Sequence, residues 1–241
     1  MIKKIKSLCL AVLSSVITMT ALSACNSDSG GNGGGGTDFQ TMIVTIASMT
    51  DSGTSFTYQN GGVTSSVITL TSTQALNKKA FKEGDRAMIA FLYENGNQSA
   101  TNIGSGEIKL YAISPVINGV LKTSEAGESM TSAPLESAYC WMAGPYVNIQ
   151  VGCVLRKEPK KFQLVLDEKT AGEEYPSVYL LFESDDETNG VLKTVVSSFN
   201  LTEFWDNPAN YQGFKLKTSV LNGQREWTFN RYGMAPVEPL Q

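Results

Sequence analysis

The residue with the most specific chemistry in this sequence is Cys25, which directly follows Leu22-Ser23-Ala24. Three lysines near the start precede an apolar run from Leu8 to Leu22. A basic start, an apolar stretch and small residues before a cysteine are typical of a bacterial lipoprotein signal ending in a lipobox. We therefore predict that residues 1–24 are a signal peptide and that Cys25 is lipidated. The lipid would anchor the chain to the membrane of the bacterial envelope, at the periplasmic face of the outer membrane or at the surface.

A transmembrane helix and an ordinary cleaved signal are the alternatives for this leader. Its apolar part is short and rich in Ser and Thr, whereas a membrane span needs about 20 mostly apolar residues. An ordinary signal peptide needs no cysteine directly after its small residues. Lipid attachment at Cys25 is the interpretation that accounts for all of these features.

The segment that follows Cys25 has low complexity. Residues 26–37 contain six glycines with Ser, Asn, Thr and one Asp, and no apolar residue. Such a tract cannot bury enough surface to offset chain entropy, so we expect a flexible tether over residues 25–37. A phosphate-binding glycine loop is the alternative, but no strand precedes the tract and no Gly-Lys-Ser/Thr ends it.

Charge and composition restrict the possible functions. The leader holds three of the 19 basic residues and none of the 23 acidic ones, so the mature chain has a net charge of −7. Nucleic-acid binding rests on neutralising phosphates, so we expect no nucleic-acid partner. The sequence also contains no histidine, which rules out Ser-His-Asp and Cys-His relays and His-liganded zinc. We predict no catalytic residues, no metal and no cofactor, and hence that the protein is not an enzyme.

Cys140 and Cys153 are the two thiols left for the mature fold, because the leader removes one cysteine and the lipid occupies another. In an oxidising compartment such a pair is a disulfide candidate, and closing the loop would contribute about 3 kcal/mol. The alternative is two buried free thiols. A tight hairpin around Ala143-Gly144-Pro145 would place Cys140 opposite Ile149, not Cys153. The sequence leaves both possibilities open.

Two acidic clusters are candidates for metal binding or acid–base chemistry. Asp185-Asp186-Glu187 lacks the alternate spacing and the distal Glu of a calcium loop, so we expect a solvated turn. Glu173-Glu174 together with Asp185 and Asp186 would supply the carboxylate pair of a hydrolase, although exposed loop charge is the simpler interpretation.

Four aromatic residues are candidates for ligand binding. Tyr139, Trp141, Tyr146 and Trp205 would form a platform for a glycan if their rings lay on one exposed face. The alternative is that these rings fill a hydrophobic core and hydrogen-bond only their polar tips.

From Phe39 onward the pattern is almost entirely β. Apolar and β-branched runs predict strands over residues 42–47, 66–71, 87–93 and 108–113, with a short helical or turn segment over residues 76–82. Several short strands with one small helical piece are typical of a small closed barrel. We place this barrel domain at residues 38–121 and a polar linker at residues 122–136.

The second half alternates more cleanly between apolar and polar residues. On one predicted strand Val147, Ile149 and Val151 share a face, and Tyr146, Asn148 and Gln150 share the other. Similar alternation recurs further on, and residues 178–182 form an apolar run suited to a central strand. This pattern predicts an antiparallel β-sandwich over residues 137–241, with one helical turn near residues 202–205.

Several of these segments together resemble a known family. They are Phe81-Lys82-Glu83-Gly84-Asp85-Arg86-Ala87-Met88-Ile89, Trp141-Met142-Ala143-Gly144-Pro145-Tyr146-Val147-Asn148-Ile149, Lys161-Phe162 and Ser198-Phe199-Asn200-Leu201. With the lipobox and tether, and in this order, they are similar to the NigD-like lipoproteins over most of the mature chain. Pro145, where a glycine is more usual, and the two cysteines depart from the family pattern and bear on the local hairpin geometry.

The resemblance implies an N-terminal domain of OB type and a C-terminal β-sandwich, and it supplies no catalytic residues. We predict a non-enzymatic, lipid-anchored envelope protein that recognises another protein or a glycan. A bacteriocin-associated immunity role is one alternative, because the family is named for its association with a bacteriocin gene cluster. A hydrolase using Glu173, Glu174, Asp185 and Asp186 is another.

Overall fold

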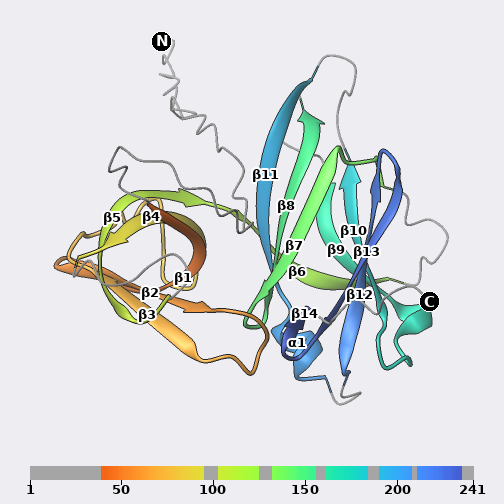
Figure 1. Ribbon diagram of the computed structural model, residues 1–241, viewed down its shortest axis with the longest axis horizontal. Coiled ribbons are helices and arrows are strands. Elements are labelled where there is room, and N and C mark those ends of the chain that lie inside the picture. Colours follow the sequence, from red (N-terminus) through yellow and green to blue (C-terminus); the bar gives the residue numbers. More distant parts are fainter. Residues whose placement is uncertain are drawn as a thin grey trace, which may run out of the picture. The chain divides into compact units, whose positions relative to one another are not determined.

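The computed structural model describes residues 39–94, 103–124, 132–155, 161–183, 190–207 and 211–234. The predicted leader, Cys25 and the tether lie outside these residues. The described chain is almost entirely β, with five strands in a closed barrel and nine in one large sheet (Figure 1). The predicted fold class, a small barrel followed by a sandwich, is confirmed.

The barrel has the strand order β1-β2-β3-β5-β4 and closes by pairing of β1 with β4. Strands β3 and β5 pair in parallel, and the other pairs are antiparallel. Five strands closed in this way agree with the OB-type barrel that the resemblance implies. The strands are β1 (Gln40–Thr50), β2 (Gly53–Gln59), β3 (Val67–Ser72), β4 (Arg86–Tyr93) and β5 (Gly106–Pro115).

Alternate side chains of these strands point inward and fill the barrel. Phe56, Leu70 and Phe91 are fully buried there, and burying one such side chain contributes about 1.5–3 kcal/mol. Strand β2, rich in Thr and Ser, carries a weak apolar signal and was not among the predicted strand ranges. Residues 76–82 form turns, in which the Asn77 carbonyl accepts from the amides of Ala80 and Phe81, so no helix forms there.

The sandwich is one nine-stranded sheet with the order β14-β13-β12-β10-β9-β6-β11-β8-β7. Its edge strands β14 and β7 contact each other, so the sheet folds over into two layers around a common core. Its elements are β6 (Ile117–Ser124), β7 (Ser137–Ala143), β8 (Tyr146–Leu155), β9 (Lys161–Asp167), η1 (Glu168–Thr170), β10 (Ser177–Glu183), β11 (Val191–Asn200), α1 (Thr202–Trp205), β12 (Gly213–Val220), β13 (Gly223–Asn230) and β14 (Gly233–Met234).

The position of β6 corrects the predicted domain boundary. The predicted barrel end at residue 121 and the start of the linker at residue 122 both fall inside this strand, which pairs in parallel with β9 and β11 at the centre of the sheet. Its polar C-terminal half misled the sequence interpretation, since Lys122 is exposed and its Nζ bonds Gln163 Oε1 at 3.0 Å. Strands β10 and β12 also pair in parallel, so the predicted antiparallel sandwich is a mixed sheet.

The predicted helical turn is confirmed as α1, which follows β11 and buries Phe204 and Trp205 against the core. Within the described part of the chain, no helix has the length and apolar character that crossing a membrane requires.

Candidate functional site

Arg86, the first residue of barrel strand β4, makes the most extensive buried polar contacts of the described chain. Only 4% of its surface is exposed. Its Nε donates to Ser198 Oγ at 3.0 Å, Nη1 to Thr45 Oγ1 at 3.0 Å and Nη2 to Asn148 Oδ1 at 3.2 Å. Its Cζ also lies 4.3 Å from the ring centroid of Tyr146. One side chain thus connects barrel strands β1 and β4 with sandwich strands β8 and β11.

The charge of Arg86 is held without a carboxylate. No Asp or Glu of the described residues forms an ion pair with it. Burial lowers the pKa of Arg86 to about 10, so the guanidinium remains charged at neutral pH. Three neutral oxygens and an aromatic face replace the water that the charge has lost. Ser198 Oγ also donates to Asn148 Oδ1 at 2.8 Å, so the acceptors are positioned by one another.

The Arg86 site joins three of the segments on which the family resemblance rests. Arg86 comes from the Gly-Asp-Arg entry to β4, Tyr146 and Asn148 from the start of β8, and Ser198 from β11. The turn Gly144-Pro145 pairs Ala143 with Tyr146, and Gly144 has the positive φ of 62° that this tight turn requires. As predicted, Val147, Ile149 and Val151 share the core face of β8 and Tyr146, Asn148 and Gln150 share the other face, on which Asn148 is fully buried beside Arg86.

Sequence reasoning did not single out Arg86 as a site residue. The available signal was an arginine that directly precedes an otherwise apolar strand, where the charge has to be either exposed or bonded. Its three partners are 41, 62 and 112 residues away in the sequence, so no local pattern identifies them.

Of the two alternatives that the sequence left open for the cysteines, the structure has the free thiols. Cys140 and Cys153 are both free and buried. The hairpin register pairs Cys140 with Ile149, as the alternative interpretation expected, and Cys153 lies four positions further along β8. At about 3.3 Å per residue this separates the two by roughly 13 Å, whereas a disulfide needs Cα atoms within about 7 Å.

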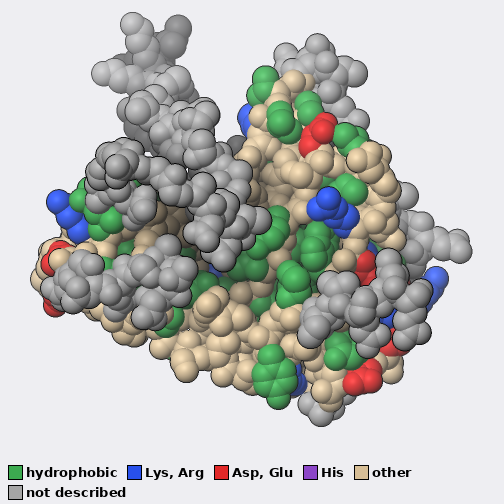
Figure 2. Space-filling model, in the orientation of Figure 1, with side chains coloured by type: hydrophobic (Ala, Val, Ile, Leu, Met, Phe, Trp, Pro, Cys, Tyr) green, Lys and Arg blue, Asp and Glu red, His purple; other side chains and the backbone are tan. Residues whose placement is uncertain are grey.

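The structure brings together only two of the four candidate platform aromatics. Tyr139 and Trp141 point to the same side of β7, with ring centroids 5.5 Å apart and planes inclined by 35°. Tyr139 is 58% exposed. Trp205 instead lies in the core against Phe214, and Tyr146 lies against Arg86. Hydrophobic side chains are visible among polar ones on the sandwich face that carries β7 and β8 (Figure 2).

The acidic candidates are not assembled into a site. Glu173 and Glu174 are exposed in the turn that follows η1. Asp185-Asp186-Glu187 lies outside the described residues, so the carboxylate pair of a hydrolase and the calcium loop stay untested. Within the described ranges, no three Asp, Glu, His or Cys residues are grouped so that they could hold a metal ion.

Comparison with known families identifies the second half of the chain. Residues 119–231 match the model of the NigD-like C-terminal beta sandwich domain. The match begins inside β6, so it agrees with the observed sheet and not with the predicted start at residue 137. It confirms the resemblance that the sequence segments indicated. No curated protein matches the chain.

Solved structures of Bacteroides proteins share the fold. A protein of unknown function from Bacteroides vulgatus has a TM-score of 0.60 and 14% identity, over 83% of this chain and 92% of its own. A candidate lipoprotein from Bacteroides fragilis has a TM-score of 0.53 and 13% identity, over 80% of this chain and 96% of its own. A NigD-like immunity protein from Bacteroides caccae has a TM-score of 0.50 and 15% identity, over 78% of this chain and 90% of its own. At these identities the likeness shows the fold alone, but its extent includes both barrel and sandwich.

We predict that Arg86→Lys lowers the free energy of unfolding by about 2–4 kcal/mol. An ammonium cannot reach three acceptors in the plane of a guanidinium, and each buried group left without a partner costs about 1–3 kcal/mol. Urea unfolding followed by tryptophan fluorescence measures the loss. The reverse exchange at an exposed site, Lys79→Arg, should stay within about 0.5 kcal/mol of the parent. A loss below about 1 kcal/mol for Arg86→Lys would contradict this role.

We also predict that the two thiols make the fold sensitive to alkaline pH. Burial raises the pKa of Cys153 to about 11 and also raises the pKa of Cys140. Thiols of the unfolded chain ionise near pH 8.5, so between about pH 9 and 11 the folded chain holds more protons than the unfolded one. The free energy of unfolding must therefore fall as pH rises through this window, by up to about 1.4 kcal/mol per pH unit and thiol.

Tyr and Lys side chains also titrate in this pH range. Comparing the parent chain with a variant that lacks one thiol separates the contribution of that thiol to the alkaline loss of stability from theirs. Between pH 8 and 11, the free energy of unfolding should fall less steeply for Cys153→Ser than for the parent chain. Parallel curves for the two proteins would show that the Cys153 thiol does not cause the alkaline loss.

Proposed function

Because residues 119–231 match the model of the NigD-like C-terminal β-sandwich domain, we propose that this chain is a lipid-anchored, non-catalytic binding protein of the cell envelope. Cys25 and the leader before it supply the anchor. The similar structure from Bacteroides fragilis carries the name of a candidate lipoprotein, which supports a location at the cell envelope. The predicted tether over residues 25–37 would give the β modules a reach of about 20 Å from the membrane.

The aromatic pair on β7, in which Tyr139 is exposed and Trp141 is half-buried, carries the proposal of binding. Tyr139 and Trp141 present neighbouring rings on the outer face of the sheet, where the apolar side of a sugar ring can stack. Gln150 pairs with Tyr139 across the strands and lies on the same face, so its amide can bond a hydroxyl group. A glycan is the ligand that this combination fits best.

An immunity role is the second candidate function. The Bacteroides caccae structure is named a NigD-like immunity protein and shares the fold. An immunity protein acts by binding a toxin, so this role also calls for recognition and no catalysis. Its ligand would be a protein, and this separates it from the glycan proposal.

The anchor is tested by the substitution Cys25→Ser. Without the thiol no acyl chain can be attached, so the variant should leave the membrane fraction and should not incorporate labelled palmitate. Cys153→Ser is the matched control and should remain membrane-bound and labelled. A Cys25→Ser protein that still sediments with the envelope would refute lipid anchoring at this residue.

The binding face is tested by Trp141→Ala and Tyr139→Ala. We expect a glycan-array signal from the parent chain and at least a tenfold loss of affinity in each variant, because each removes a stacking ring worth about 0.5–1.5 kcal/mol beyond the apolar area that it buries. Tyr232→Ala removes a more exposed tyrosine elsewhere and should bind as the parent does. An empty array together with a toxin captured by crosslinking in intact envelopes would favour the immunity role. The absence of any glycan or protein partner would overturn both proposals.

A further inference from the structure

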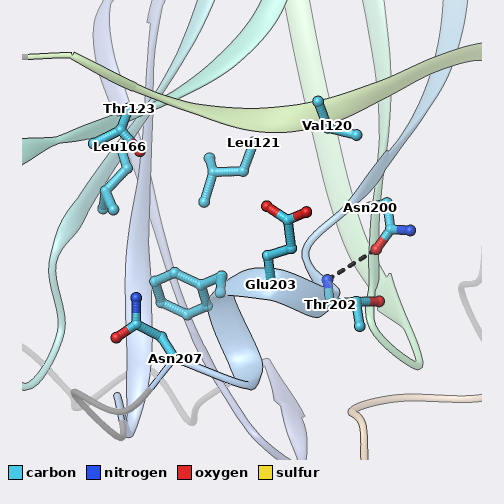
Figure 3. Close-up of a pocket in the computed structure, with 9 residues that line it drawn as sticks. Val120, Leu121, Thr123, Leu166, Asn200, Thr202, Glu203 and Asn207 are labelled. Atoms are coloured by element: carbon cyan, nitrogen blue, oxygen red, sulfur yellow. Dashed lines mark hydrogen bonds between the residues drawn. The ribbon is translucent and has the colours of Figure 1, made fainter.

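A pocket of about 410 Å³ lies between β6, β9 and α1 of the sandwich (Figure 3). Its volume is within the range of about 300–1,000 Å³ that is usual for small-molecule sites. No part of the proposed glycan face contributes to it. Its apolar lining is Val120, Leu121, Leu166 and Phe204, and its polar lining is Thr123, Asn200, Thr202, Glu203 and Asn207.

Glu203 is the only charged residue of the nine that line this pocket. Its carboxylate is directed into the pocket, between Leu121 and Val120 (Figure 3). Asn200 Oδ1 accepts from the backbone amide of Thr202 at 2.8 Å, and this bond connects the end of β11 with the first residue of α1, the element that carries Glu203.

No basic side chain of the described chain pairs with this carboxylate. On β6, the nearby Lys122 instead bonds Gln163 Oε1. The negative charge of Glu203 therefore remains available to a ligand, and the net negative charge of the mature chain favours the approach of a cation.

The apolar wall is held in a fixed position. The Phe204 ring stacks on Tyr211 with centroids 4.6 Å apart and planes inclined by 15°, and Phe214 packs against its edge at 5.6 Å. Leu166 is buried from β9, and Leu121 is half-buried on β6. A rigid apolar wall facing one carboxylate is complementary to a molecule with a cationic end and an apolar body.

We propose that this pocket binds a primary ammonium group carried on an apolar body. The ammonium would pair with Glu203, and the body would cover Leu121, Leu166 and Phe204. A free amine and the N-terminus of a peptide that begins with an apolar residue share this chemistry. The site is separate from Tyr139 and Trp141, so either proposal can fail without the other.

Calorimetry with the full-length chain tests the charge preference. The probe is 2-phenylethylamine, and its matched controls are neutral 2-phenylethanol and anionic 3-phenylpropanoate. We expect the amine to bind, the alcohol to bind about fivefold more weakly, and the carboxylate to show no binding. A peptide amide Phe-Ala-Ala with a free N-terminus, compared with its N-acetylated form, distinguishes a peptide source from a free amine. Equal binding of the amine and the alcohol would overturn the proposal.

Substitution of Glu203 locates the site. Because this side chain is exposed, Glu203→Gln should weaken amine binding by about fivefold, as expected for a surface ion pair. Glu203→Lys should reverse the preference, so that 3-phenylpropanoate binds better than the amine. Glu173→Gln, an exposed glutamate outside the pocket, should leave both affinities unchanged. Retention of the amine preference by Glu203→Lys would refute this pocket as the binding site.

Discussion

The hydrogen bonds of the Arg86 guanidinium constrain both halves of the molecule at once. Removing a charge from water costs several kcal/mol, and only a complete set of partners offsets that cost. The partners here come from β1, β8 and β11, so the barrel and the sandwich must each present their oxygens at the correct place. The Gly144-Pro145 turn and the register of β8 with β11 are therefore conditions for burying this one charge.

Local alternation made the two faces of β8 predictable, because successive side chains of a strand point to opposite faces with a period of two. The register of Cys140 with Ile149 also followed from the sequence, since a short turn fixes the pairing on both sides of it. Strand β6 could not be predicted in the same way. Its neighbours β9 and β11 are distant in sequence, and parallel pairing leaves no turn signal between partners.

The candidate sites were partly predictable for the same reasons. Residue type alone indicated that aromatic rings could serve either as core or as platform, and tertiary packing decided the outcome for each. Trp205 became core because α1 lies against Phe214, whereas Tyr139 lies on the outer face of β7. The Glu203 pocket was missed because it exists only where β6 passes α1, and β6 is the strand that the sequence interpretation had divided between the barrel and the linker.

The central place of β6 also affects how this protein is made. It is the first sandwich strand to be synthesised, yet both of its hydrogen-bonding neighbours emerge much later, and β11 comes near the end of the chain. Long loops must close before such contacts form, and this slows folding. While the chain is being synthesised, the apolar side of β6 and the charge of Arg86 both lack partners that are encoded further along the chain. A chain with this topology depends on protection from aggregation until its last third has arrived.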